Sequence, residues 1–256
     1  AGSGERVREG LTITQWTLGT VRVEEDELAR DLLAQGSQLN VVEGGGRLRW
    51  NAHVREWLGP DQRSASTGIF SVISQLPIQK LRSAVWAEGI HVAELVVHGP
   101  GFEEVPLSIL LVDLPSTPRR SRAAIAHRLR ELLPQASLGT YDLVIGDFNM
   151  PADSDALASL FPGFEPVWPS AGSGWAGTYP RSWPLVRIDH VLAGPRVEIT
   201  FIETVDPGRG RHRLQNFDVR PRRSAPPPAK PLAHSDVKMF QTSWAWVPLS
   251  MASLPS

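Results

Sequence analysis

The segment Tyr141–Pro151, with the sequence Y-D-L-V-I-G-D-F-N-M-P, constrains the fold more than any other part of the chain. Residues 143–145 form an apolar run without polar alternation, which is typical of a strand buried on both faces. Gly146 ends that run, and Asp147 and Asn149 follow it two positions apart. In extended backbone, residues i and i+2 point to the same side. A carboxylate and a carboxamide are therefore predicted to project together from the end of a buried strand.

Two interpretations of this pair of polar residues are open at this point. Asp and Asn are both good helix N-caps, and an isolated D-x-N is more often a cap than a site. The alternative is a ligand site, because a buried charge is costly unless a cation, a donor or water meets it. The remainder of the chain decides between these interpretations.

The composition leaves a broad class of proteins open. The 256 residues are enough for a sizeable core, the formal net charge is −1 and there is no cysteine. Disulfides, thiolate metal sites and cysteine nucleophiles are excluded. The longest apolar runs, such as Leu107–Val112, have the length of a strand, so no transmembrane segment is expected. The chain starts without methionine, which suggests that an upstream targeting or anchor segment has been removed, and the compartment cannot be inferred.

The hydrophobic pattern predicts an α/β protein in which strands and helices alternate. Apolar and β-branched runs predict strands at 11–17, 39–42, 68–74, 107–114 and 187–192, a strand or hairpin at 84–97, and a final strand at 237–247. Amphipathic patterns predict helices at 24–35, 122–133 and 153–161. No repeat and no clear linker is present, so a single domain spanning 1–256 is expected.

One basic stretch, at about 207–233, departs from this pattern. Six arginines, one lysine and one aspartate give it a local charge of +6, and it includes three consecutive prolines. The interpretation is an insertion or long loop, either a solvated segment or a basic flap over an anionic substrate. Together with Arg187, its residues Arg220, Arg222 and Arg223 are predicted to bind substrate.

Acidic or amide residues are predicted at four separate strand ends. Glu43 precedes three glycines, Asp147 precedes Asn149, and Asp189 and Asp236 lie at or near further strands. Oxygen ligands of this kind suit a hard divalent cation, Mg²⁺ or Mn²⁺, which can bind a phosphate and offset charge on a leaving oxygen.

The motifs resemble those of the endonuclease/exonuclease/phosphatase superfamily, which includes DNase I-like nucleases, sphingomyelinases and inositol phosphatases. The resemblance covers residues 11–247, and the motifs occur in the family's order: I-T-Q-W-T-L-G, L-N-V-V-E-G, G-I-F-S-V-I-S-Q-L-P-I, I-G-D-F-N-M-P, T-Y-P followed by R-I-D-H, and the closing Ser235-Asp236. It implies a four-layer α/β sandwich, in which two mixed β-sheets pack face to face with helices outside.

The resemblance also implies roles for single residues. Glu43 would bind the metal, and Asp147 would position or deprotonate the attacking water. Asn149 would contact the phosphate, and Asp236 would assist with the metal or with orientation. Asp189 would orient a catalytic histidine.

Three departures from the family pattern fall on the chemistry. Thr17 replaces a metal-associated asparagine, Asp113 replaces a phosphate-binding histidine, and Val237 replaces the histidine of the closing Ser-Asp-His. The sequence offers two ways of rebuilding the site. His234 would supply the missing imidazole, and Asp113 would join the metal ligands.

Two functions follow from the motifs and their departures. The first is a Mg²⁺- or Mn²⁺-dependent phosphoester hydrolase, of phosphodiesterase, nuclease or phosphatase type, with weakened or rebuilt catalysis. The alternative is an inactive descendant that binds a phosphorylated ligand, nucleic acid or protein. The substrate class is open among nucleic acid, lipid and small phosphoesters, and a monomer is expected.

Overall fold

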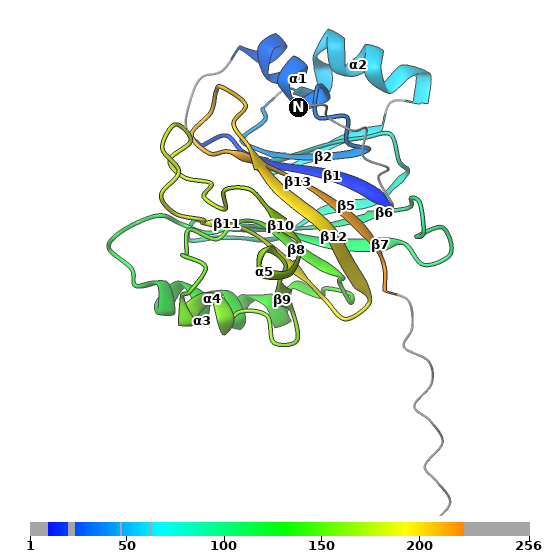
Figure 1. Ribbon diagram of the computed structural model, residues 1–256. Helices are drawn as coiled ribbons and strands as arrows, with labels where there is room; N and C mark the ends of the chain where they lie inside the picture. The colour runs from blue at the N-terminus through cyan, green and yellow to red at the C-terminus, as the bar shows by residue number, and fades with distance from the viewer. Residues whose placement is uncertain (1–9, 20–23, 47, 62, 223–256) are drawn as a thin grey trace, which may run out of the picture. The chain divides into compact units, whose positions relative to one another are not determined.

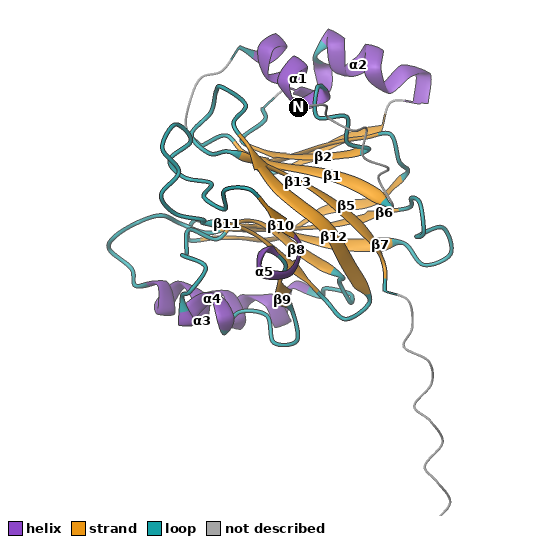
Figure 2. Ribbon diagram, viewed as in Figure 1, coloured by secondary structure: helices purple, strands orange, loops and turns teal. Residues whose placement is uncertain are grey.

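The computed structural model describes residues 10–19, 24–46, 48–61 and 63–222, and this part of the chain is a four-layer α/β sandwich (Figure 1). Two mixed sheets lie face to face with helices on their outer sides, as the sequence predicts (Figure 2). Helices α1 (Glu25–Leu33) and α2 (Ala52–Leu58) cover the first sheet. Helices α3 (Arg122–Leu132) and α4 (Asp155–Ala158) cover the second.

The first sheet has seven strands in the order β10-β12-β13-β1-β2-β4-β3. Their bounds are β1 (Leu11–Thr17), β2 (Leu39–Glu43), β3 (Arg63–Thr67), β4 (Phe70–Ser74), β10 (Gly172–Ser173), β12 (Val197–Val205) and β13 (Leu214–Pro221). β1 and β2 are parallel, with Thr17 paired to Glu43 at their carboxyl ends. The two side chains therefore reach the same edge of the sheet.

The second sheet has six strands in the order β5-β6-β7-β8-β11-β9. Their bounds are β5 (Ile78–Ala87), β6 (Ile90–Val97), β7 (Leu107–Asp113), β8 (Leu143–Asp147), β9 (Glu165–Pro166) and β11 (Asp189–Ala193). β7 and β8 are parallel and pair Asp113 with Asp147, while antiparallel β11 pairs Asp189 with Asp147. Three carboxylates thus meet at one end of this sheet. The short helix α5 (Trp168–Ala171) precedes β10.

Three apolar clusters hold the layers together. The largest lies between the sheets and includes Ile13, Val41, Ile109 and Ile145. The other two lie between each sheet and its helices. Burying apolar surface contributes roughly 25 cal/mol per Å², so these three clusters are the main stabilising contribution and fix the spacing of the sheets.

The interpretation of 207–233 as an insertion is wrong for its middle part. Residues 214–221 form β13, which pairs with β1 on one side and β12 on the other. Phe217 and Val219 enter the core between the sheets, while Asn216 accepts a hydrogen bond from Thr14 Oγ1 at 2.8 Å. The composition suggested a loop because arginines flank the segment and polar residues occur within it. The segment forms a strand because its buried polar residues are hydrogen-bonded.

Other elements differ from the sequence prediction at their ends. The apolar segment at 84–97 is a hairpin of β5 and β6, and the helix expected at 153–161 is limited to α4. Strands β3 and β12 and helix α2 were not predicted. The strand expected at 237–247 lies outside the described residues. None of the helices in the described part is long and apolar enough to cross a membrane.

Candidate active site

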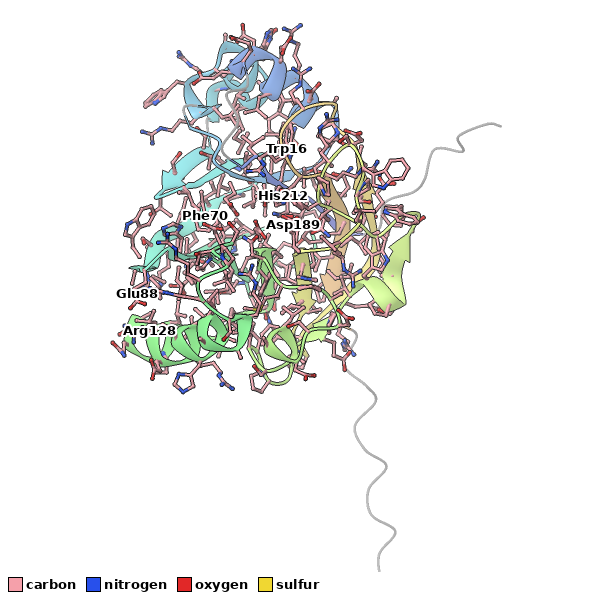
Figure 3. The ribbon with its side chains drawn as sticks, turned by 90° about the vertical axis from the view of Figure 1, so that its left-hand side faces the viewer. Trp16, Phe70, Glu88, Arg128, Asp189 and His212 are labelled. Atoms are coloured by element: carbon pink, nitrogen blue, oxygen red, sulfur yellow. The ribbon has the colours of Figure 1, made fainter. Side chains whose placement is uncertain are left out.

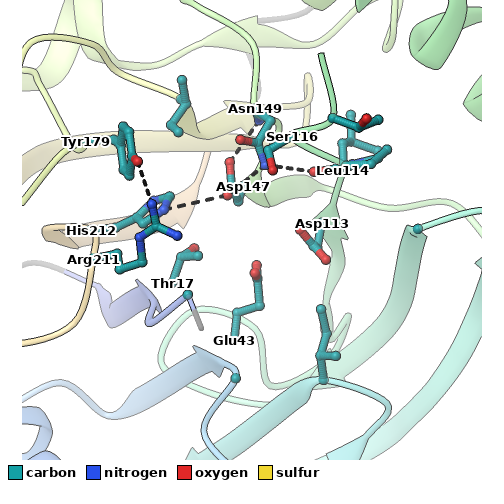
Figure 4. Close-up of a pocket in the computed structure, with 17 residues that line it drawn as sticks. Thr17, Glu43, Asp113, Leu114, Ser116, Asp147, Asn149, Tyr179, Arg211 and His212 are labelled. Carbon is teal, nitrogen blue, oxygen red and sulfur yellow. Dashed lines mark hydrogen bonds and ion pairs between the residues drawn. The ribbon is translucent and has the colours of Figure 1, made fainter. Parts of the chain in front are cut away.

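A cavity of about 560 Å³ opens where the carboxyl ends of β1, β2, β7 and β8 meet the loops before β11 and β13. Its walls hold the polar residues predicted for these strand ends (Figure 4). Among them are Thr17 and Glu43 from the first sheet and Asp113 and Asp147 from the second. The edge shared by the two sheets therefore assembles one polar site from segments far apart in the sequence.

Close approach of β7 and β8 depends on Gly146. Its φ of +139° is one that side-chain-bearing residues rarely adopt, and a Cβ there would lie 1.9 Å from the Val112 carbonyl oxygen. Gly146 lies inside β8 and does not end it, because the strand continues to Asp147. The glycine thereby lets Asp147 lie in register with Asp113.

Glu43, Asp113 and Asp147 form an acidic cluster. Their ligand oxygens lie within 4.8 Å of one another, and Glu43 Oε2 is buried without a hydrogen-bond partner. Burial raises the pKa of Glu43 well above its ordinary value, and the charges of Asp113 and Asp147 raise it further. An unpartnered buried carboxylate oxygen facing two other carboxylates fits a divalent cation, which would relieve both the burial cost and the repulsion.

Asp113 also has a partner on the neighbouring strand. His91 of β6 is its register partner, and the His91 Nδ1 to Asp113 Oδ2 distance is 2.8 Å. Burial raises the pKa of Asp113, and the hydrogen bond and charge of His91 oppose that rise. The histidine thus holds this carboxylate toward the cluster.

Asn149 holds Asp147 in place. The Asn149 backbone N–H donates to Asp147 Oδ1 at 2.8 Å, and its Nδ2 donates to Asp147 Oδ2 at 3.0 Å and to the Leu114 carbonyl at 2.7 Å. The side-chain amide has only two N–H donors, and both are used in these contacts. The predicted role of Asn149 as a phosphate contact is therefore not supported by this geometry, in which it orients Asp147.

A histidine that sequence reasoning missed completes the site. His212, in the loop before β13, places its Nδ1 2.8 Å from Asp189 Oδ2 and its Nε2 3.9 Å from Asp147 Oδ2. Figure 3 shows His212 and Asp189 side by side in the interior of the molecule. Burial lowers the pKa of His212, but the charge and hydrogen bond of Asp189 outweigh burial and raise it overall. The charge of Asp189 thus favours the protonated form of the ring.

Asp189 has the opposite pKa shift from its neighbours. Burial alone would raise its pKa, but the charge of His212 and hydrogen bonds from His212 and Thr178 lower it overall. Thr178 Oγ1 also accepts from the Asp189 backbone N–H at 3.3 Å. Asp189 is therefore ionised, and its carboxylate fixes His212 with Nδ1 as the donor.

The predicted residues divide into those in this cavity and those outside it. Glu43, Asp113, Asp147 and Asn149 line the cavity, and Asp189 lies directly behind His212. The sequence placed the catalytic histidine at 234. His234, Asp236, Val237 and Arg223 all lie outside the described residues. The signal for His212 was a histidine two residues before a strand that has both apolar and polar residues.

Of the arginines predicted to bind substrate, Arg187, Arg220 and Arg222 lie in the described part of the chain and do not line the cavity. Arg187 lies over the Trp168 ring at 5.3 Å. Arg220 pairs with Glu198, and Arg222 donates to the Val197 carbonyl. At roughly 3.3 Å per residue in a strand, Arg220 is about 26 Å along the chain from His212. The cavity instead contains Arg211, whose Nη2 donates to Tyr179 Oη at 2.8 Å.

Comparisons with known proteins agree with this architecture. A search of solved structures found a mannosyl-6-phosphatase from Bacteroides thetaiotaomicron at 9% identity, with a TM-score of 0.62, covering 82% of this chain and 99% of that one. An endonuclease/exonuclease/phosphatase family protein from the same organism matches at 10% identity and a TM-score of 0.64, covering 83% and 98%. A humanized TDP2 from D. rerio matches at 15% identity and a TM-score of 0.60, covering 82% and 98%.

These structural matches show a shared fold. A search of curated proteins gave no match. The model of the endonuclease/exonuclease/phosphatase family matches residues 36–232, which is most of the chain and includes every cavity residue from Glu43 to His212. The chain belongs to the endonuclease/exonuclease/phosphatase family.

Proposed function

We propose that the cavity hydrolyses a phosphoester bond with the help of a divalent cation, Mg²⁺ or Mn²⁺. Membership of the family supports phosphoester hydrolysis in general. The observation that carries the proposal for this chain is the placement of His212, tied to Asp189, beside Asp147 in the same cavity as Glu43. The cavity is thus lined by an imidazole and by the carboxylates of a candidate cation site.

Glu43 and Asp113 would hold the cation, and Asp147, the third carboxylate of the cluster, faces His212. When bound, a hard divalent cation supplies positive charge that binds a phosphate oxygen and stabilises the leaving oxygen. Both Mg²⁺ and Mn²⁺ prefer oxygen ligands, so the experiment tests each of them.

Asp147 is the proposed base. Burial and the charge of Asp189 raise its pKa well above the ordinary value, which strengthens it as a proton acceptor. In the proposed step it takes a proton from a water molecule as the water oxygen forms a bond to phosphorus. The bond from phosphorus to the ester oxygen breaks on the opposite side, and the leaving oxygen is protonated by solvent.

His212 acts on the same side of phosphorus as Asp147. The two side chains are 3.9 Å apart, which leaves no room for a phosphorus centre with entering and leaving groups in line between them. The protonated Nε2 therefore donates to a non-bridging phosphate oxygen. Positive charge at that oxygen offsets the negative charge of the transition state.

The alternative of an inactive ligand-binding descendant relied on the missing histidine at Val237 and on the basic stretch at 207–233. His212 places an imidazole in the cavity, and residues 214–221 of the basic stretch are the strand β13, both of which support the hydrolase. Thr17 and Asp113 remain as departures from the family pattern. Asp113 is accommodated as a third carboxylate of the acidic cluster.

The experiment measures release of p-nitrophenolate from a phosphomonoester and a phosphodiester with Mg²⁺ or Mn²⁺. Asp147→Asn and His212→Gln are expected to lower kcat by roughly 10²–10⁴-fold each. Asp153→Asn, at an exposed aspartate six residues beyond Asp147, is the matched control and should retain activity. Equal rates for the wild type and Asp147→Asn on both substrates would reject the proposal.

A further inference from the structure

We infer that Arg211 binds a non-bridging oxygen of a doubly charged terminal phosphate and makes the site selective for phosphomonoesters over phosphodiesters. This inference rests on the proposed function and names its substrate class. It concerns a residue that the sequence prediction left out of the site.

The position of Arg211 is fixed by contacts along its length. Its backbone N–H donates to the Leu18 carbonyl at 3.0 Å, and its carbonyl accepts from the Arg181 backbone N–H at 2.8 Å. The side-chain stem passes over Gly19, where a Cβ would lie 2.9 Å from Arg211 Cδ. The guanidinium then reaches Tyr179, donating to its hydroxyl with Cζ 5.6 Å from the ring centre (Figure 4). The head group is thereby held at the mouth of the cavity.

The charge of Arg211 is available to a ligand. Two other arginines of the neighbouring loops have carboxylate partners: Arg181 pairs with Asp206, and Arg209 with Glu27 and Asp31. Within the described ranges, Arg211 forms no ion pair, and its one side-chain hydrogen bond goes to a neutral hydroxyl. An arginine held beside a catalytic histidine without a carboxylate partner is suited to an anionic substrate group.

The number of positive groups around the cavity indicates which phosphate fits. The amide donors of Asn149 are already used by Asp147 and Leu114. The nitrogen groups that line the cavity are the His212 imidazole and the Arg211 guanidinium, and the acidic cluster that would hold the cation lines the same cavity. Together with the cation, these make three partners, one for each non-bridging oxygen of a monoester.

A diester has only two non-bridging oxygens and one negative charge. It would leave one positive group without an oxygen partner and would place its second ester group against Arg211 and Tyr179. A charge-assisted hydrogen bond is stronger than a neutral one, so losing it costs affinity. The geometry therefore favours the dianion.

The test compares p-nitrophenyl phosphate with methyl p-nitrophenyl phosphate, which share one leaving group and differ by a methyl on one oxygen. The wild type should prefer the monoester. Arg211→Gln should lower kcat/KM for the monoester by roughly 10- to 100-fold and change the diester rate by less than about threefold. Arg211→Lys should restore part of the preference. Arg220→Gln, which removes a positive charge outside the cavity, near the end of β13, should change neither rate.

Two results would overturn the inference while leaving the proposed function intact. One is an equal loss on both substrates in a folded Arg211→Gln variant, which would indicate a structural role. The other is a wild-type preference for the diester. A binding measurement covers the case in which neither substrate turns over. Inorganic phosphate with Mg²⁺, titrated calorimetrically, should bind roughly tenfold more weakly to Arg211→Gln, and equal affinity would overturn the inference.

Discussion

His212 Nδ1 and Asp189 Oδ2 are joined by a 2.8 Å hydrogen bond that crosses from the loop before β13 in one sheet to the first residue of β11 in the other. The bond fixes the imidazole with Nε2 toward Asp147. It also raises the pKa of His212, although burial acts to lower it. The orientation and the charge of the histidine therefore have one common origin.

Asp189→Asn should weaken both the orientation and the positive charge of His212. We expect kcat to fall by roughly 10²–10⁴-fold, because the ring loses its orientation and its stabilising charge. In the proposed mechanism the protonated His212 is the active form, so activity is expected to fall as pH rises through its pKa. Loss of Asp189 lowers that pKa, so the alkaline limb of the pH–rate profile should move to lower pH. A profile measured on the folded variant checks this, and an unmoved limb would contradict it.

Glu43→Gln should stabilise the metal-free protein while abolishing its response to metal. Burial and the charges of Asp113 and Asp147 make an ionised Glu43 unfavourable. Removing the charge is expected to raise the free energy of unfolding in EDTA by about 1–3 kcal/mol. Urea denaturation at pH 7.5 measures this. Added Mg²⁺ should raise the stability of the wild type and leave the variant unchanged, and a variant less stable than wild type in EDTA would count against the prediction.

Gly146→Ala should disrupt the pairing of β7 and β8. A Cβ would overlap the Val112 carbonyl oxygen, which is backbone and cannot rotate away, and the positive φ adds strain. We expect a loss of stability of roughly 3 kcal/mol or more, with loss of activity through displacement of Asp113 and Asp147. Gly163→Ala, at a positive φ with open space around it, separates strain from steric overlap. A Gly146→Ala variant as stable as Gly163→Ala would contradict the overlap argument.

His190 should make stability depend on pH between about 4 and 6.5. Burial lowers its pKa to about 4, and its Nε2 lies 2.8 Å from the Met150 carbonyl. The unfolded chain binds a proton near pH 6.5, so stability is present above that pH and is lost as pH falls. From pH 7.5 to 5 the loss is about 2 kcal/mol from this group.

The matched variant for this effect is His190→Asn. Urea denaturation of both proteins at pH 7.5 and pH 5 gives the difference, and the variant should lose less stability than the wild type over that interval. The quantity compared is the change in the free energy of unfolding between the two pH values within each protein. Any pH-independent effect of the substitution on stability cancels in that difference. Identical pH dependence would show that His190 is not the group responsible.

Much of the fold and the acidic half of the site could be predicted because both depend on local sequence. The apolar run at 143–145 and the D-F-N that follows specify a buried strand and its polar end within a few residues. Glu43 before three glycines gives a similar local signal. Parallel pairing then brings such strand ends to one edge.

His212 could not be predicted in the same way because its role depends on pairing across long distances. β13 carries Gln215, Asn216 and Asp218 between its apolar residues, and such a composition is typical of a loop. These polar side chains can be buried because other residues form hydrogen bonds with them, as Thr14 of β1 does with Asn216. Arg211 could not be singled out either, because it is one of six arginines in the basic stretch at 207–233.

The two halves of the site belong to different sheets: Glu43 ends β2 and His212 lies in the loop that leads into β13 of one sheet, while Asp113, Asp147 and Asp189 belong to strands of the other. The side chains of the inter-sheet core, such as Val41 and Ile109, therefore act as a spacer that sets the separation of the reacting groups. A change of one methyl group in this layer alters the alignment of chemistry at the edge without touching a single cavity residue. In the proposed mechanism, the thickness of the apolar layer therefore affects the reaction rate.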